Sequence, residues 1–124
     1  MKIKNIVVEV KSIEDTLSEA KKIMEKLEKG IGVEKKESIS FRNVDVMRKV
    51  LTNKRLQLIK SIRKHKPQSI YELAKIVGRD PKSVNIDIMV LNKLGMIDLK
   101  RTDKKRENIV PKVNYEKIDI AIAV

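Results

Sequence analysis

The sequence has no cysteine, a single histidine and very few aromatic residues. The absence of cysteine excludes disulfides, thiol catalysis and thiolate zinc sites. His65 lies in a basic turn with no serine or carboxylate beside it, so it is better interpreted as a solvated loop residue than as a general base. No glycine-rich phosphate-binding loop is present. We therefore expect a protein that is not an enzyme and that carries no metal and no cofactor, although a small-molecule pocket at a dimer interface stays open.

Long apolar runs are also absent. No stretch approaches the roughly 20 apolar residues that a membrane-spanning helix needs. Residues 1–10 mix Lys, Asn and Glu with apolar residues, unlike a signal peptide. A chain of 124 residues that is 41% apolar can bury one compact core and carry an accessory segment. We therefore expect a cytoplasmic protein.

Positive charge is abundant and unevenly placed. The net charge is +12, and residues 42–112 hold 19 basic against 7 acidic residues. Residues 1–41 hold 9 against 8, and residues 113–124 hold 1 against 2. A lysine-rich surface that serves solubility alone would not be segregated in this way. The distribution indicates a polyanionic partner for the central part of the chain.

The stretch from Ser69 to Gly95 predicts two short helices joined by a tight turn. Ser69 and Glu72 have the spacing of a capping box ahead of an apolar i, i+3, i+4, i+7 pattern. Gly78 follows that pattern, and Asp80 and Pro81 then supply an N-cap and a first helical residue. The second helix buries Val84, Ile88, Leu91 and Leu94 and leaves the other faces to Lys82, Ser83, Asn85, Ile86, Met89 and Lys93.

A two-stranded hairpin with a charged turn at 98–108 is expected after this helix pair, since Met96, Ile97 and Leu99 precede the turn and Ile109, Val110 and Val113 follow it. Through "SIYELAKIVGRDPKSVNIDIMVLNKLGMIDL" the chain resembles winged helix-turn-helix regulators of the MarR and ArsR type. It is most similar to small archaeal DNA-binding proteins of this type, a resemblance that includes "SISFRNVDVMRKVLTNKRLQLIKSI". The resemblance implies a recognition helix at 81–94 that enters the major groove and a basic wing beside it.

Candidate DNA contacts lie on the recognition helix, in the turn before it and on the wing. Asn85 is suited to adenine, Ser83 to several base groups, and Lys82 to guanine or phosphate. An exposed Ile86 departs from the usual hydrogen-bonding residue and would meet a thymine methyl group or a protein partner. Asp87 is expected to be structural, paired with Arg55 or Arg79. The full set is Ser69, Arg79, Lys82, Ser83, Asn85, Ile86, Met89, Lys100, Arg101, Lys104, Lys105 and Arg106.

The N-terminal region predicts a strand and then a helix. Lys2–Val10 places Ile6, Val8 and Val10 on one face, and Ser12 caps a helix with a narrow apolar stripe. That stripe, Ile13, Leu17, Ala20, Met24 and Leu27, has nearly a 3.5-residue period. It indicates either packing on the body, which is favoured, or pairing with a second copy. Gly30 and Gly32 end the helix, and residues 33–38 form a linker.

The remaining elements complete an α+β, mainly helical fold. Asn43 caps a short helix, and Thr52 begins a helix that ends at His65–Pro67. Tyr115–Val124 alternates Ile118, Ile120 and Ile122 with other residues, so this strand must be covered, and it should share a sheet with Lys2–Val10 within a subunit or across a dimer. The expected organisation is an N-terminal strand-helix extension at 1–38, a winged helix-turn-helix domain at 39–114 and a C-terminal strand at 115–124.

The function expected from these features is sequence-specific binding of double-stranded DNA by a homodimeric transcriptional regulator, a repressor that blocks polymerase. Two alternatives remain. One is a DNA-binding antitoxin that autoregulates its operon and holds a toxin partner through the N-terminal unit or the C-terminal strand. The other is a winged-helix adaptor without DNA contact, in which Ile86 and Met89 form a protein-contact patch.

Overall fold

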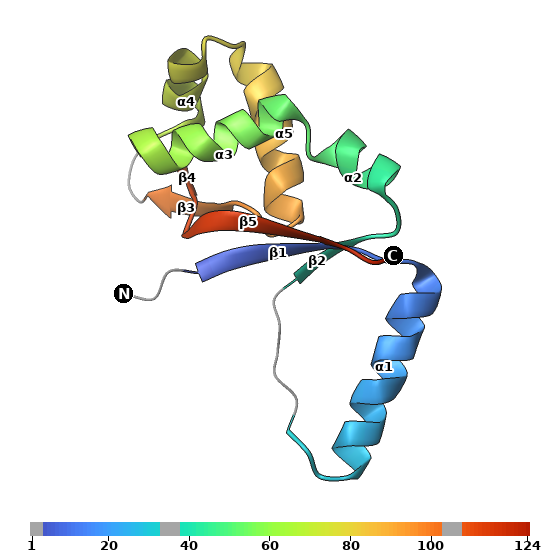
Figure 1. Cartoon of the computed structure of the whole chain (residues 1–124). Helices are drawn as coiled ribbons and strands as arrows, with labels where there is room; N and C mark the ends of the chain where they lie inside the picture. Colours follow the sequence, from blue (N-terminus) through green and yellow to red (C-terminus); the bar gives the residue numbers. More distant parts are fainter. Residues whose placement is uncertain (1–3, 33–37, 103–107) are drawn as a thin grey trace. The chain divides into compact units, whose positions relative to one another are not determined.

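The computed structural model describes residues 4–32, 38–102 and 108–124, and within them the chain forms five helices and five strands of an α+β fold (Figure 1). Two compact units are present, one made of residues 1–49 with 116–124 and the other of residues 50–115. In these described ranges no helix combines the length and apolar character needed to cross a membrane.

The first unit contains a three-stranded sheet in the order β2-β1-β5. It consists of β1 (Lys4–Val10), β2 (Ser38–Phe41) and β5 (Tyr115–Ile122). Strands β1 and β2 are parallel, with Val10 opposite Phe41, and Ala123 N donates to Val10 O at 3.0 Å. Val8, Val10 and Phe41 are buried. The pairing of the two terminal strands that the sequence indicated is therefore present.

Strand β2 was not expected from the sequence. Ser38 was assigned to a linker and residue 39 to the start of the DNA-binding domain, but Ser38–Phe41 pairs with β1, so the second unit begins at Val50. The rest of the predicted linker, residues 33–37, lies outside the described residues. A four-residue strand carries too little period-2 signal to be distinguished from a loop, and a whole helix, α1 (Ile13–Glu28), separates it from its partner in the sequence.

Helix α1 (Ile13–Glu28) has well-formed ends. Ser12 Oγ accepts from Asp15 N and the Asp15 carboxylate accepts from Ser12 N, which is a complete capping box. At the other end Gly30 has a φ of 74°, and Ile31 N and Gly30 N donate to Lys26 O and Leu27 O, as in a Schellman motif. These caps fix both ends of the helix without tertiary contacts.

The favoured packing of α1 on the body of the chain is wrong. None of its residues is buried, and Ile13, Leu17, Met24 and Leu27 are each more than 60% exposed. Strand β5 was expected to be covered within a subunit or across a dimer, and in the single chain Ile120 and Ile122 are about half exposed. Both apolar surfaces belong to the first unit, and no described residue of that unit covers them.

Helix α2 (Val44–Val50) joins the two units, and Asn43 Oδ1 accepts from Val46 N at its start, as expected. The second unit packs α3 (Asn53–His65), α4 (Ile70–Val77) and α5 (Pro81–Lys93) around an apolar core. Thr52, Ser69 and Asp80 cap the three helices as predicted. The core consists of Leu58, Ile59, Ile62, Leu73, Ala74, Val84, Ile88, Leu91, Met96, Ile97 and Val110.

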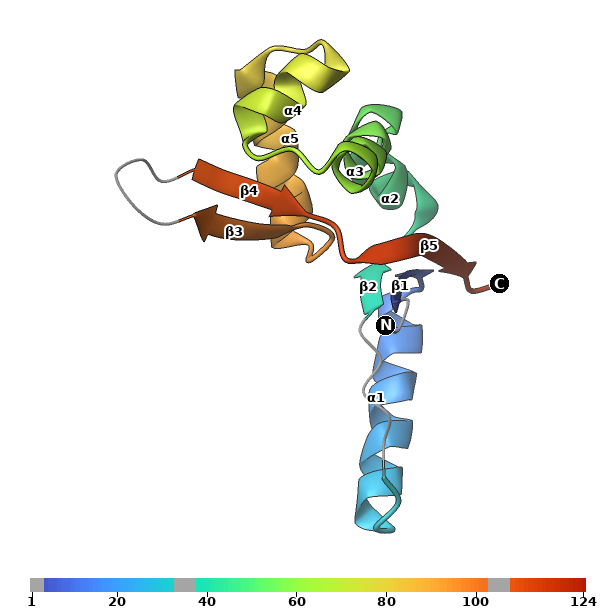
Figure 2. The ribbon, with the colours of Figure 1, turned by 90° about the vertical axis from the view of Figure 1, so that its left-hand side faces the viewer.

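An antiparallel hairpin of β3 (Asp98–Thr102) and β4 (Asn108–Lys112) follows α5 (Figure 2). The predicted turn at 98–108 is too long, because Asp98–Thr102 continues the ladder opposite Asn108–Lys112. Residues 103–107 lie outside the described residues, and with them the candidate contacts Lys104, Lys105 and Arg106.

Tyr115 closes the base of this hairpin. Its hydroxyl donates to Met96 O at 2.8 Å, its carbonyl accepts from Arg63 Nη1 at 2.9 Å, and the side chain is buried. Next to it, Asn114 Nδ2 donates to Asp98 Oδ2 at 2.8 Å. The hairpin is therefore tied to the residues that follow α5 and to α3.

Candidate nucleic-acid interface

The turn between α4 and α5 fixes where α5 begins. Gly78 adopts φ 66°, and Arg79 N donates to Ala74 O at 3.0 Å, which ends α4. Asp80 then accepts from Ser83 N, and Pro81 occupies the first helical position. Two turn residues, Arg79 and Asp80, therefore separate Gly78 from α5, and Lys82 and Ser83 lie in the first turn of this helix.

Helix α5 has a buried face and an exposed edge. Val84, Ile88 and Leu91 have no exposed surface, which confirms three of the four predicted core residues, whereas Leu94 is the C-cap and is only partly buried. Lys82, Ser83, Asn85 and Ile86 are exposed, with Ile86 at 62%. Met89 was expected on the same edge but is partly buried. Lys93, which was also expected outside the core face, is exposed at the C-terminal end of α5.

Asp87 on α5 is bound by two arginines. Its Oδ2 accepts from Arg79 Nη2 at 2.8 Å and its Oδ1 accepts from Arg55 Nε at 3.0 Å, so both arginines named as alternatives are partners. Arg55 Nη1 also donates to Val50 O at 2.8 Å. Burial by itself would raise the pKa of Asp87, but the hydrogen bonds from Arg79 and Arg55 outweigh it and hold the pKa below its ordinary value.

This network places Arg79 with the structural residues of the turn. Its side chain is about 19% exposed, and Nη1 is buried without a hydrogen-bond partner in the described structure. The candidate DNA contact at Arg79 is therefore largely buried, with its Nη2 bound to Asp87. The contacts of Asp87 with Arg55 and Arg79 join α3 and the turn to α5, the helix that carries the exposed edge.

Ser69 is half-buried at the start of α4. Its Oγ accepts from Glu72 N at 3.0 Å, but the Glu72 carboxylate accepts from Gln68 N at 3.3 Å instead of from Ser69 N. The expected capping box is therefore only half formed, because the return bond reaches one residue further back. The Ser69 hydroxyl is occupied by the cap.

On the hairpin, Lys100 and Arg101 are exposed on β3. They are opposite Val110 and Ile109, and successive strand residues point to opposite faces. One of the two therefore lies on each face of the hairpin, and a duplex against one face meets one of them directly.

Tyr71 and Lys75 form an exposed pair on α4 that the sequence analysis did not single out. Tyr71 is 60% exposed, and Lys75 Nζ lies 4.8 Å from the centre of its ring. The signal was present as an aromatic residue and a lysine at i and i+4, a spacing that brings two helical side chains together. This pair adds one exposed cation and one aromatic face to the second unit.

Acidic and metal-binding groups are sparse in this region. No group of three or more His, Cys, Asp or Glu side chains is arranged to hold a metal ion among the described residues. With Asp87 engaged by two arginines, the edge formed by Lys82, Ser83, Asn85 and Ile86 offers a cation, hydrogen-bonding groups and one apolar side chain.

These features define a small α+β protein with a basic second unit, in which a capped helix exposes the edge of its N-terminal half. The chain belongs to the HVO_A0114 family, whose model matches residues 50–120, more than half of the chain. A search of curated proteins found no match.

Proposed function

We propose that this protein is a winged helix-turn-helix regulator that binds double-stranded DNA. Helix α5 is the recognition helix and the β3–β4 hairpin is the wing. The observation that carries the proposal is the division of α5, where three apolar residues are fully buried and Lys82, Ser83, Asn85 and Ile86 are exposed together. In a helix-turn-helix, the N-terminal residues of the second helix contact base edges.

The chemistry of the exposed edge suits a major groove. Asn85 pairs with adenine through its amide, Ser83 bonds to several base groups, and Lys82 reaches guanine or a phosphate. Ile86 contacts a thymine methyl group. The Arg55–Asp87–Arg79 network supports this reading because it holds α5 against the turn and α3, and a rigid helix discriminates bases better than a mobile one.

The charge distribution supports a duplex as the polyanion. Residues 42–112 carry the whole net charge of +12, and they include nearly all of the second unit. Lysine and arginine side chains there neutralise phosphates and release counterions. On this proposal the protein is a cytoplasmic homodimer that places two copies of α5 in major grooves about 34 Å apart and represses transcription from its operator.

The test is a titration of labelled duplex of random sequence, followed by the DNA upstream of the protein's own gene, at several KCl concentrations. We expect log K to fall linearly with log salt, with a slope of about −0.9 for each phosphate neutralised. We also expect tighter binding to a near-palindromic upstream site than to random duplex. A slope near zero would rule out the groove model.

A role as a protein-binding adaptor is a second candidate, because Ile86 is 62% exposed in the middle of the proposed reading edge. Ile86→Gln separates the two roles. On the DNA proposal this variant keeps the salt slope and changes preference at one base pair. On the adaptor proposal the wild type has no salt-dependent duplex affinity.

A further inference from the structure

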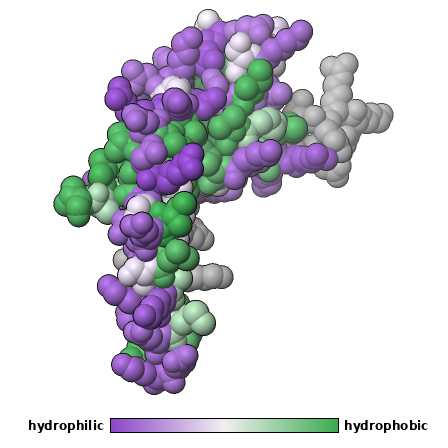
Figure 3. All heavy atoms as spheres, turned by 90° about the vertical axis from the view of Figure 1, so that its right-hand side faces the viewer, coloured by the Kyte–Doolittle hydropathy of each residue, from purple (hydrophilic) through white to green (hydrophobic). Residues whose placement is uncertain are grey.

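Helix α1 carries an exposed apolar stripe along its whole length. The stripe consists of Ile13, Leu17, Ala20, Met24, Leu27 and Ile31. Its large members are between 51% and 64% exposed. The spacings alternate between four and three residues, which is the a/d pattern of a helix that packs against another helix. Figure 3 shows apolar side chains at the surface of α1, in the lower part of the view.

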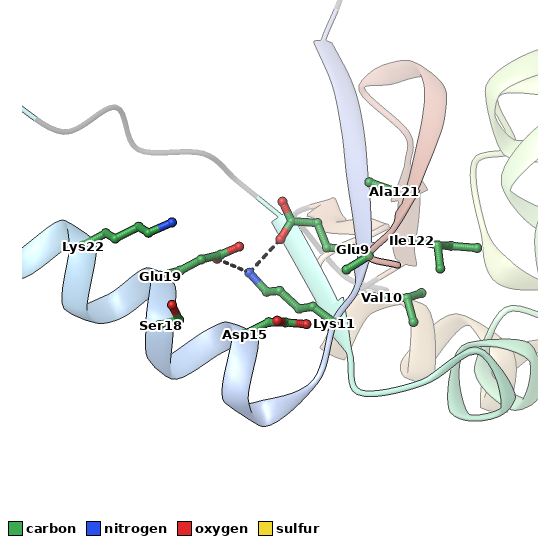
Figure 4. Close-up of a pocket in the computed structure, with 10 residues that line it drawn as sticks. Glu9, Val10, Lys11, Asp15, Ser18, Glu19, Lys22, Ala121 and Ile122 are labelled. Carbon is green, nitrogen blue, oxygen red and sulfur yellow. Dashed lines mark hydrogen bonds and ion pairs between the residues drawn. The ribbon is translucent and has the colours of Figure 1, made fainter.

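The opposite face of α1 is the one directed toward its own sheet. Asp15, Ser18, Glu19 and Lys22 line an open pocket together with the last residues of β1 and the residues that end β5 (Figure 4). At about 100° per residue, the mean direction of these four positions is roughly 170° from that of the stripe. Only this polar face of α1 therefore approaches the ends of the strands, and the apolar stripe covers no strand of the sheet.

Lys11 holds α1 in this orientation. Its Nζ lies 2.6 Å from Glu19 Oε2 on the helix and 2.7 Å from Glu9 Oε2 on β1 (Figure 4). These two partners, Glu19 before Glu9, raise the pKa of Lys11 above its ordinary value. Turning the stripe toward the sheet would break the Lys11–Glu19 contact, so the described residues of this unit supply no partner for the stripe.

We propose that the stripe pairs with α1 of a second copy of this chain, antiparallel, around a two-fold axis at Lys22. Ile13 and Ile31 are each nine residues from Lys22, Leu17 and Leu27 are each five, and Ala20 and Met24 are each two. Antiparallel pairing therefore sets Ile13 against Ile31, Leu17 against Leu27 and Ala20 against Met24 of the other copy. The stripe is complementary to itself, as a two-fold interface requires.

Side-chain size favours the antiparallel direction at the centre of the seam, which is the line of contact between the two stripes. Antiparallel pairing places the small Ala20 against the long Met24 on both sides of the axis, so the two layers next to the axis are filled equally. Parallel pairing would stack Ala20 on Ala20 and Met24 on Met24, leaving a gap in one layer and crowding the next. The Schellman motif fixes Ile31 beside the last turn, which extends the apolar stripe past the end of the helix.

Charge favours the same direction. Residues 13–20 carry three acidic and no basic side chains, whereas residues 21–29 carry four lysines and two glutamates. Antiparallel pairing places each acidic half beside the basic half of the other copy and opposes the two helix dipoles. Residues 1–41 are also nearly neutral, so two strongly basic chains meet there with the least repulsion.

The first test measures the oligomeric state of the full chain by analytical ultracentrifugation without DNA. We expect a dimer for the wild type and at least a tenfold weaker dimer for Leu17→Glu, which buries a charge in the seam. Ser18→Glu adds the same charge one residue away on the opposite face and is the matched control. Because Leu17 is exposed in the single chain, circular dichroism should show both variants folded. A monomeric wild type, or a Leu17→Glu dimer of unchanged strength, would overturn the proposal.

The second test determines direction by disulfide cross-linking, since the chain has no cysteine of its own. Leu17→Cys and Leu27→Cys chains with different tags are co-expressed, purified as mixed pairs and oxidised. Antiparallel pairing predicts a disulfide between a Leu17→Cys chain and a Leu27→Cys chain. It predicts none between two chains of the same kind, because their cysteines would lie about 15 Å apart along the helix axis. Bridges within each kind would show parallel pairing, and no bridge would show that α1 is not the seam.

The pairing of α1 rests on the proposed function only where it explains how two copies act together on DNA. The experiments distinguish a failure of the helix pairing from a failure of DNA binding. A monomeric Leu17→Glu chain that still binds random duplex with a steep salt dependence supports both. A wild-type dimer cross-linked at α1 with no duplex affinity would leave the helix pairing intact and refute the DNA proposal.

Discussion

Asp87 Oδ2 lies 2.8 Å from Arg79 Nη2, so a carboxylate on α5 is bound to the turn from which the same helix starts. The other oxygen of Asp87 binds Arg55 on α3 at 3.0 Å. An acidic residue on a helix proposed to approach phosphates is unfavourable unless cations neutralise it. Here two arginines do so, and the contact sets the position of α5 relative to α3.

Replacing Asp87 with Asn should lower the free energy of unfolding by about 2 kcal/mol, because two partly buried guanidinium groups then lack an anionic partner. Urea unfolding at pH 7 measures this change. Asp80→Asn is the matched control, since Asn caps a helix as well as Asp does and the expected change is within a few tenths of a kcal/mol. Equal stability of Asp87→Asn and the wild type would show that the network contributes nothing.

The same contact should make stability depend on acid. The pKa of Asp87 is lowered from 3.8 in the folded chain, so the unfolded chain takes up this proton first as the pH falls. The contribution of Asp87 is present above pH 3.8 and is lost as the pH falls through the folded pKa. The stability difference between wild type and Asp87→Asn should therefore be constant from pH 7 to pH 5 and shrink below pH 3.8. A difference that persisted at pH 2 would contradict a charge-based role.

Lys82 and Asn85 should affect DNA binding in different ways. Lys82→Ala should weaken binding to all duplexes and reduce the magnitude of the salt slope by about 1, because one phosphate contact is lost. Asn85→Ala should cost about 1–3 kcal/mol on the preferred site and relax preference at one base pair, with the salt slope unchanged. Fluorescence anisotropy against a set of single-base variants measures both effects. Lys117→Ala, an exposed lysine on β5, is the control for general loss of charge.

Gly78 is required by the backbone of the turn between α4 and α5. Its φ is 66°, and a Cβ at this position would meet no atom within 4 Å, so the cost of Gly78→Ala comes from conformation alone. We expect a loss of about 1 kcal/mol in the free energy of unfolding. Gly32→Ala, where the space is equally open and φ is not positive, should be neutral or slightly stabilising. Equal effects of the two variants in thermal unfolding would refute the assignment.

Local signals explain which parts of the fold were predictable. Thr52, Ser69 and Asp80 each accept from a backbone N–H three residues on, and this bond depends on residues within one turn. The buried face of α5 followed from apolar spacing for the same reason. Lys82 and Asn85 could then be predicted as exposed, because the other face of the same helix was already assigned to the core.

Non-local choices explain the failures. Strand β2 exists because Ser38–Phe41 meets β1 across a whole helix, and nothing in four residues encodes that partner. The polar face of α1 lies toward the strand ends because Lys11 bridges Glu9 and Glu19, and Glu19 is eight residues beyond Lys11 in the sequence. Apolar periodicity showed that the stripe needs a partner but not whether that partner belongs to the same chain.

The Tyr115 hydroxyl should stabilise the hairpin base in a pH-dependent way. Tyr115→Phe keeps the ring but leaves Met96 O without its donor, which should cost about 1 kcal/mol in urea unfolding at pH 7. Burial, together with the nearby charge of Asp98, raises the pKa of Tyr115 to about 12 from 10.0, so the unfolded chain loses the phenolic proton first. The contribution is fully present below pH 10 and is lost as the pH rises through about 12. Over that interval the wild type should lose its advantage over Tyr115→Phe. The exposed Tyr71 supplies the control, because Tyr71→Phe should leave the stability at pH 7 unchanged.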